Sequence, residues 1–307
     1  YVAGDKISKI WEDDDNKYWF NNEDGTWGIL ESKIPVGCQV VNGKYIIERY
    51  LIDDLWETET VDNIFNQATF LLSKILPTSF MRSSTMGTAA TWKLLMLGWA
   101  YKNGLGVPHT MPTKGFTGGL SRLLEVGFSK NVVKFDFASL YPSIQLTHNV
   151  FTDCDVTGAM RGLLQYNYDY RNLYKKLKSD FSKKGDKEKS DYYDKKQLPL
   201  KILNNGMFGS ISAPNIYPWG DTNMGEKITC TGRQYLRHMI RFFNKKGFKP
   251  LVGDTDGFNF SIPNNIDEFI YTSEGKHRFN EKGKTYKGLD AVVAEYNDRY
   301  MKGVMGL

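Results

Sequence analysis

Three aspartates stand at positions whose spacing could build a site for two divalent cations. Asp254 and Asp256 flank Thr255 on a predicted hairpin turn, and Asp136 lies in a strand-like run over residues 132–137. Carboxylate oxygens are ligands that Mg²⁺ prefers, and a pair of such ions neutralises charge at the attacking and leaving oxygens of a phosphoryl transfer. Lysines between the two segments could bind a polyphosphate. The pattern therefore fits the chemistry of templated nucleotide addition.

Two simpler interpretations of these aspartates are a calcium-binding loop and a helix cap. A calcium loop of the EF-hand type needs Gly at its sixth and Glu at its twelfth position, but counting from Asp254 places Gly257 fourth and Asn265 twelfth. Asp136 alone could cap a helix. The ordered set of three carboxylates favours the metal site over both.

Composition limits the class of protein. The chain has 307 residues, 41% of them hydrophobic and 14% aromatic, which fits a globular protein with two or three subdomains. No segment is apolar and long enough to cross a membrane, and no signal peptide is visible. Three cysteines and four histidines are scattered, which argues against a disulfide framework, a zinc site or a histidine-based metal site. We expect a cytoplasmic protein, and, since residue 1 is Tyr rather than Met, a processed or truncated chain.

The distribution of charge is more informative than the net charge of +5. Residues 171–201 carry eleven Lys and Arg: Arg171, Lys175, Lys176, Lys178, Lys183, Lys184, Lys187, Lys189, Lys195, Lys196 and Lys201. Such a run is more often a solvated helix face. Its position between Asp136 and Asp254 favours phosphate binding by selected members.

The pattern of apolar and turn residues predicts a mixture of strands and helices with a helical hairpin in the middle of the chain. The predicted β elements are a hairpin over 17–30 and strands over 250–252 and 258–262, and the predicted helices span 53–75, 85–101, 158–182, 187–208, 228–244 and 289–300. Pro142 is expected to begin a helix, and Pro199 to kink one.

Four segments resemble motifs of the family B DNA polymerases. Residues 135–143 (FDFASLYPS) resemble motif A, D-x-x-S-L-Y-P-S, and residues 201–209 (KILNNGMFG) resemble motif B, K-x-x-x-N-S-x-Y-G, with Gly206 and Phe208 as departures. Residues 252–257 (VGDTDG) resemble motif C, Y-G-D-T-D-S, and residues 229–233 (TCTGR) are similar to T-x-x-G-R. The resemblance covers about residues 114–256, and its wording looks most like bacteriophage polymerases of the crAss-like group.

The resemblance implies roles for individual residues. Asp136, Asp254 and Asp256 are the implied catalytic acids, and Asp136, Asp256 and Phe137 the implied ligands of two Mg²⁺ ions, for which Mn²⁺ can substitute. The implied nucleotide-binding residues are Ser139, Leu140, Tyr141, Arg171, Lys175, Lys201 and Asn205. Free N–H groups around Ser139 and Leu140 are expected to face phosphates. Tyr141 would lie under the sugar as a gate against the 2′-hydroxyl, with a packed core tyrosine as the alternative.

Residues 116–119 (FTGG) resemble the Y-x-G-G loop of the family, which touches the template strand. Phe116, Gly118 and Gly119 are therefore implied DNA-binding residues, and a plain flexible connector is an equally open interpretation. Upstream, Tyr50 and Asp54 fit the third exonuclease motif, Y-x-x-x-D, but no D-x-E motif precedes them. Residues 1–113 are thus expected to hold the end of an exonuclease domain without editing activity of its own.

The motif resemblance also implies an α+β fold, an antiparallel sheet with helices and the helical hairpin as an insertion. The remaining division predicted by the resemblance is palm over 114–156, fingers over 157–209 and palm over 210–307. We expect no K-x-Y element after Asp256 and no room for a thumb within residues 264–307. The expected partners are primer–template DNA, dNTPs and a separate chain or segment that carries exonuclease and thumb, with no membrane. The alternatives to a DNA polymerase are a catalytically silent polymerase-like scaffold and a nucleic-acid-binding subunit.

Overall fold

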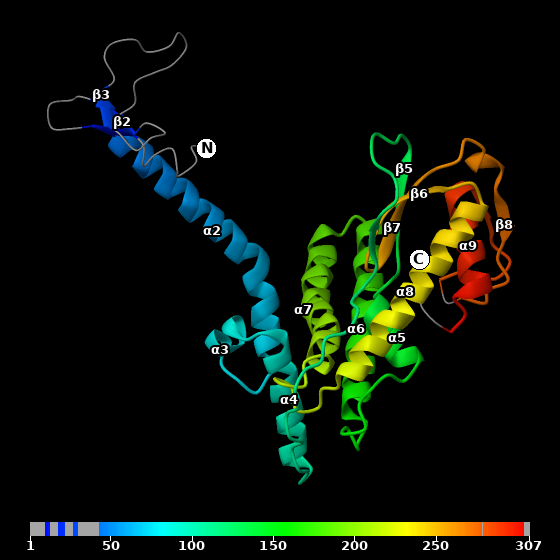
Figure 1. The fold of residues 1–307 in the computed structure, drawn as a ribbon, viewed down its shortest axis with the longest axis horizontal. Coiled ribbons are helices and arrows are strands. Elements are labelled where there is room, and N and C mark those ends of the chain that lie inside the picture. Colours follow the sequence, from blue (N-terminus) through cyan, green and yellow to red (C-terminus); the bar gives the residue numbers. More distant parts are fainter. Residues whose placement is uncertain (1–9, 13–17, 22–26, 30–42, 278, 304–307) are drawn as a thin grey trace. The chain divides into compact units, whose positions relative to one another are not determined.

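The computed structural model describes residues 10–12, 18–21, 27–29, 43–277 and 279–303, with the side chains of 10–12, 18–21, 27–29, 43–46 and 63–68 excepted. The chain divides into two compact units, Tyr1–Gln67 and Ala68–Leu307, which are described separately (Figure 1).

The first unit contains a three-stranded antiparallel sheet. Strands β1 (Ile10–Glu12), β2 (Tyr18–Asn21) and β3 (Trp27–Ile29) pair in that order, and Trp19 lies opposite both Trp11 and Ile29. The hairpin predicted over residues 17–30 is confirmed as the β2–β3 pair. Helix α2 (Gly43–Ser73) begins ten residues before the predicted helix, so Tyr50 lies inside it together with Asp54.

The second unit is organised around a four-stranded antiparallel sheet in the order β4-β6-β7-β5. Its strands are β4 (Ser121–Leu123), β5 (Val132–Asp136), β6 (Lys249–Asp254) and β7 (Gly257–Ser261). Gly257 lies opposite Asp136 on one neighbouring strand and opposite Asp254 on the other. The register therefore brings the motif A and motif C segments to the same end of the sheet.

A helical hairpin comes after β4 and β5 in the chain. Helices α6 (Ala159–Lys183) and α7 (Lys187–Ile211) flank Lys184, Gly185 and Asp186, close to the predicted bounds. Gly185 has a φ of 75°, which glycine adopts without strain, and the Asp186 side chain accepts a hydrogen bond from the Lys189 amide. Pro199 lies inside α7, which continues to Ile211.

The unit has further helices, which include α3 (Phe80–Thr85), α4 (Thr88–Lys102), α5 (Leu140–Thr147) and α8 (Thr222–Lys245). Helix α8 contacts the sheet, and α4 and α5 contact the hairpin. Two of them begin earlier than predicted. Helix α8 starts at residue 222 because Asp221 caps it, and α5 starts at Leu140, so Pro142 occupies its third position rather than its first.

The last segment is a small α+β element. It consists of the 3₁₀ turn η1 (Ile266–Glu268), the paired strands β8 (Ile270–Thr272) and β9 (Thr285–Lys287), and α9 (Gly288–Tyr300). Phe242 of α8 packs against Tyr296 of α9 with 5.0 Å between ring centroids. The segment is therefore fixed to the helix that covers the sheet.

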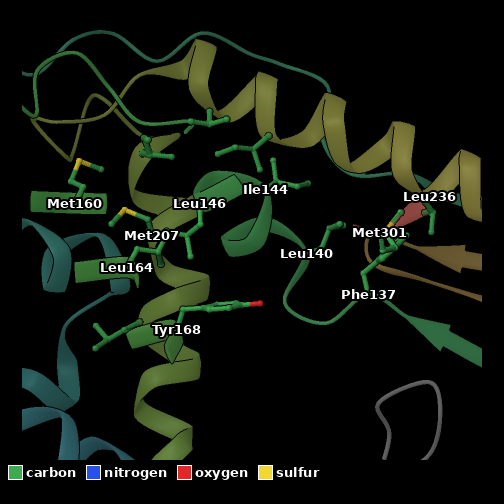
Figure 2. Close-up of a cluster of buried hydrophobic side chains, with 14 of the residues drawn as sticks. Phe137, Leu140, Ile144, Leu146, Met160, Leu164, Tyr168, Met207, Leu236 and Met301 are labelled. Atoms are coloured by element: carbon green, nitrogen blue, oxygen red, sulfur yellow. The ribbon is translucent and has the colours of Figure 1, made fainter. Parts of the chain in front are cut away.

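One buried hydrophobic cluster holds the parts of this unit together. Under the sheet, the Phe135 ring of β5 stacks on Phe243 of α8 with 4.3 Å between centroids. Around α5, the same cluster includes Ile144, together with Met160 and Leu164 of α6 and Met207 of α7 (Figure 2). The base of the hairpin is thus packed against the helix that follows Asp136. No helix within the described ranges is long and apolar enough to span a membrane.

Candidate active site

The three predicted acids lie at one end of the four-stranded sheet. Asp136 ends β5, Asp254 ends β6, and Asp256 lies in the turn that leads into β7. The Phe137 amide donates to the Asp256 carbonyl at 2.8 Å, which ties the motif A segment to the turn of motif C. All three side chains are exposed to solvent. Their oxygens are therefore accessible to a ligand.

The turn is held in a constrained conformation. Thr255 has a φ of 57°, the Asp256 amide donates to the Asp254 carbonyl at 2.7 Å, and the Thr255 amide donates to the Leu120 carbonyl at 2.9 Å. A Cβ on Gly257 would lie 1.7 Å from Oδ1 of Asp136. The departure from the Ser of motif C at this position therefore makes room for the Asp136 carboxylate.

Lys134 is a neighbour that the sequence analysis did not select. It lies two residues before Asp136, on the same face of β5. Its Nζ is 3.0 Å from Asp136 Oδ1, and this hydrogen bond, together with the Asp136 charge, raises the pKa of Lys134. Both side chains are exposed, so the ion pair is weak and a stronger cation could displace it.

Burial and the nearby Asp136 charge raise the pKa of Asp256 above its ordinary value, although Lys134 acts in the opposite direction. Such crowding of like charges is what a bound cation relieves. The donors are the oxygens that Mg²⁺ prefers, and Gly257 provides the space beside one of them. Among the described residues, however, no three acidic, His or Cys side chains are gathered tightly enough to hold a metal as they stand. The oxygens of the site therefore suit Mg²⁺, but Asp136 must leave its ion pair with Lys134 before it can bind the ion.

A cleft of about 500 Å³ joins the acids to the helical hairpin. Its lining residues are Asp136, Phe137, Ala138, Ser139, Arg171, Lys175, Lys201, Asn205, Asp256 and Phe279. Eight of these ten are residues predicted from the sequence, and they come from β5 and the turn that follows it, from α6 and α7, and from the β6–β7 turn. The geometry thus places two of the acids and the basic residues around a single space.

The basic side of the cleft is electrostatically crowded. Burial lowers the pKa of Arg171, and burial together with the charges of Arg171, Lys201 and Lys178 lowers the pKa of Lys175. Arg171 donates from Nη1 to Ser139 Oγ at 2.6 Å, which links the hairpin to the start of α5. Clustered cations of this kind are stabilised by a bound polyanion.

The start of α5 carries the other predicted nucleotide-binding residues. Ser139 has a φ of 55° and ψ of 56° and precedes the helix without a side-chain cap. The side chains of Leu140 and Phe137 are buried in the core, so only their backbone groups can face the cleft. Tyr141 is half-buried against Phe208, with 4.3 Å between ring centroids, and burial raises its pKa.

The predicted template loop lies beside these residues. A Cβ on Gly119 would be 3.0 Å from both Tyr141 Oη and Thr255 Oγ1, so this glycine approaches the motif A and motif C segments closely. Arg233 of α8 donates from Nη1 to the carbonyls of Thr117 and Gly118, at 2.6 and 2.5 Å. The T-x-x-G-R segment thus positions the loop, a role that its resemblance could have indicated. Phe116 is half-buried beside Gly225.

The final segment also reaches the cleft, through Phe279. No sequence pattern marked this residue, because its place depends on the packing of the last subdomain. The expectation that no K-x-Y element follows Asp256 is wrong: Lys284, Thr285 and Tyr286 have this spacing and lie at the start of β9. The Lys284 Nζ lies 5.1 Å from the Tyr286 ring centroid.

Comparisons with known proteins agree with the motif resemblance. The sequence model of DNA polymerase family B matches residues 151–271. A DNA polymerase of Desulfurococcus sp. (strain Tok) is 27% identical over 84% of this chain, and one of Thermococcus sp. (strain 9oN-7) is 28% identical over 90% of it. The chain spans 36% and 38% of those polymerases, well under half their length.

A solved structure shows the same fold. The family B DNA polymerase from the hyperthermophilic archaeon Pyrobaculum calidifontis aligns with 80% of this chain and 36% of its own, with a TM-score of 0.59 and 18% sequence identity. The profile match over α6, α7, α8, β6 and β7, together with curated relatives along most of the sequence, shows that this chain is similar to the family B DNA polymerases.

Proposed function

We propose that the second unit is the catalytic core of a template-directed DNA polymerase, which adds deoxynucleotides from dNTPs to a primer 3′-hydroxyl. The observation that carries this proposal is the single cleft in which carboxylates from two segments face cations from the helical hairpin. Acids alone or cations alone would not require this chemistry. Because the chain spans only part of its relatives, the partners that supply exonuclease and thumb functions are part of the proposal.

We assign the acidic residues of the cleft to metal binding and its basic residues to the triphosphate. Asp136 and Asp256 would hold two Mg²⁺ ions, with the Phe137 carbonyl as a further ligand and Asp254 as a supporting acid. Bound ions would neutralise charge at the attacking and leaving oxygens. Asp136 would have to leave its ion pair with Lys134 to bind them.

The hairpin and the start of α5 orient the nucleotide. Arg171, Lys175 and Lys201 bind the triphosphate, and Asn205 lies one helical turn beyond Lys201 on the same face. Tyr141 lies under the sugar as the gate against the 2′-hydroxyl, supported by its contact with Phe208. Positioning and charge stabilisation of this kind account for most catalysis of phosphoryl transfer.

Primer extension with substituted acids tests the proposal. Asp136→Ala and Asp256→Ala should each abolish Mg²⁺-dependent extension, because each removes a ligand of the metal pair, while folding and DNA binding stay close to wild type. Asp267→Ala is the matched control, since Asp267 is an exposed acid on η1 outside the cleft. Retention of more than a few per cent of activity in either active-site variant would overturn the assignment. An inactive wild type that still binds primer–template DNA would favour the silent scaffold.

A further inference from the structure

A second cavity lies against another face of the helical hairpin. Its volume is about 310 Å³, and its lining includes Tyr166, Tyr170 and Tyr174 of α6, residues 199–200 of α7 and the end of α2 within the second unit. Tyr170 and Tyr174 directly precede Arg171 and Lys175 of the catalytic cleft. Because adjacent residues of a helix point about 100° apart, α6 presents cations to one space and aromatic rings to the other.

The tyrosines form a ladder of rings. They are spaced four residues apart, and their centroids are 4.3 Å apart between Tyr166 and Tyr170 and 6.0 Å apart between Tyr170 and Tyr174. The ladder continues past the cavity, from Tyr174 to Tyr193 at 6.0 Å and from Tyr193 to Phe181 at 5.6 Å. Tyr166 is 56% exposed, so a flat ring system could stack on this end of the ladder.

A buried amide faces the same cavity. Asn167 is only 6% exposed as a whole residue, and it lines the cavity. An amide offers both a donor and an acceptor, which suits the edge of a nucleobase.

Among the described residues, the charged groups of the lining are cationic: Lys74 and Lys196 line the cavity, and no acidic side chain described there does. Lys196 Nζ lies 4.5 Å from the Tyr192 ring centroid and 5.7 Å from that of Tyr174, so its charge stands over the ladder. Stacking rings, a base-pairing amide and ammonium groups together match a nucleotide, with its planar base and anionic phosphate.

We propose that this cavity binds an unpaired nucleotide of the single-stranded template and that the ladder guides the strand beyond it. A strand, rather than a free nucleotide, is favoured because the aromatic path extends from the cavity along α6 and α7. The inference rests on the proposed function for the source of the single strand, since a polymerase holds template ahead of its primer. Sequence-tolerant stacking of this kind suits a template of any sequence.

The test is equilibrium binding of primer–template DNA in EDTA without dNTPs. One substrate has a thymidine overhang of about twelve nucleotides, within the range that single-strand sites cover, and the other has a single-nucleotide overhang. Tyr166→Ala and Lys196→Ala should weaken binding of the long-overhang substrate about fivefold to a hundredfold, because each stacked base contributes substantially. Binding of the short-overhang substrate should not change.

Matched controls come from outside the cavity. Tyr101, at the end of α4, is 91% exposed, and Lys195 is the exposed neighbour of Lys196. Tyr101→Ala and Lys195→Ala should bind both substrates as wild type does. Asn167→Leu, which keeps the volume and removes the amide, should lose long-overhang affinity with an unchanged circular dichroism spectrum.

Three results would overturn the inference. The first is that Tyr166→Ala and Lys196→Ala bind the long-overhang substrate as tightly as wild type does. The second is that these variants lose equal affinity for both substrates. The third is that thymidine monophosphate displaces the overhang at the concentration of its own dissociation constant, which would assign the cavity to a free nucleotide. Extension of the short-overhang primer separates this inference from the proposed function. If wild type does not extend it, the polymerase proposal fails, whereas the overhang measurements stand by themselves.

Discussion

Gly257 sets the geometry of the acids by its lack of a side chain. Since a Cβ there would lie 1.7 Å from Asp136 Oδ1, the Asp136 carboxylate occupies the space that any other residue would fill. We therefore expect Gly257→Ala to displace Asp136 and to lower extension activity at least about a hundredfold, because small misplacements of catalytic groups have effects of this size. Single-turnover primer extension at saturating dNTP measures this loss.

The control for this substitution is Gly162→Ala. Gly162 lies inside α6 with nothing within 4 Å of its Cβ position, so alanine should leave activity unchanged and stabilise the helix slightly. Wild-type activity in Gly257→Ala would show that the Asp136 carboxylate is not used where the structure places it.

We expect the ionised Asp256 side chain to be required for extension but to lower the stability of the fold. Its folded-state pKa is raised by burial and by Asp136, so between the unfolded and folded pKa values the folded protein binds more protons than the unfolded chain. The free energy of unfolding therefore falls as pH rises through that window. Asp256→Asn, which cannot ionise, should raise the melting temperature at pH 7 while it abolishes extension.

The same substitution should have a smaller effect on the melting temperature at a pH below the ordinary pKa of an aspartate, because Asp256 is then protonated in both the folded and the unfolded protein. Melting curves at both pH values, without divalent metal, measure the difference. A destabilised Asp256→Asn at pH 7 would mean that Lys134 stabilises the Asp256 charge more than burial and Asp136 oppose it.

At the scale of elements, the two helices of the hairpin act as one cationic surface. Arg171 and Lys175 lie one turn apart on α6, and Lys201 faces them from α7. Substitution of each by Ala should weaken dNTP binding about tenfold to a hundredfold, since charge-assisted hydrogen bonds contribute about 1.5–3 kcal/mol. Affinity for primer–template DNA should change little. Pre-steady-state incorporation gives the dNTP dissociation constant, and anisotropy gives the DNA affinity.

Lys176→Ala provides the comparison on the same helix, because Lys176 is exposed and lies outside the cleft. It should behave as wild type in both measurements. If Arg171→Ala or Lys201→Ala instead weakened chiefly the binding of duplex, the hairpin would serve DNA rather than the nucleotide.

These elements were largely predictable, because their signals are local. The hairpin bounds follow from helical spacing on either side of the Gly185 turn, and the two strands around Asp254 and Asp256 follow from alternation. Helix starts were less predictable. Asp221 caps α8, although the predicted helix begins only at residue 228. Helix α5 begins after Ser139, whose left-handed conformation a non-glycine residue does not indicate in the sequence.

At the scale of the whole molecule, the sequence motifs identified most of the cleft, whereas residues placed by tertiary packing escaped them. Lys134 became a neighbour of Asp136 through strand geometry, and Phe279 reaches the cleft through the fold of the last subdomain. Asp298 fixes that subdomain by accepting hydrogen bonds from Ser273 and Asn280 side chains and from the Glu274 amide. Such long-range contacts leave no periodic pattern in a single sequence.

The packing of this last subdomain leads to a prediction for the 307-residue chain tested alone. The segments 266–277 and 279–300 contain η1, β8, β9 and α9, which pack on each other and on α8. We propose that they add to the sheet-bearing core rather than form a thumb around duplex. Duplex would then be held mainly by phosphate contacts, with Lys284 and Tyr286 as an additional primer contact. Binding of that kind falls steeply with salt.

We therefore expect the chain alone to be distributive at low salt and nearly inactive at physiological salt, with affinity falling as a power of salt concentration close to the number of phosphates contacted. A C-terminal segment or partner chain that supplies a thumb should restore extension at the higher salt. Extension with trapped enzyme across a salt series measures both effects. Synthesis through hundreds of nucleotides in one binding event at physiological salt would contradict this prediction. It would mean that the sheet and the helical hairpin bind duplex without a thumb, and that the β8–β9 segment holds the primer.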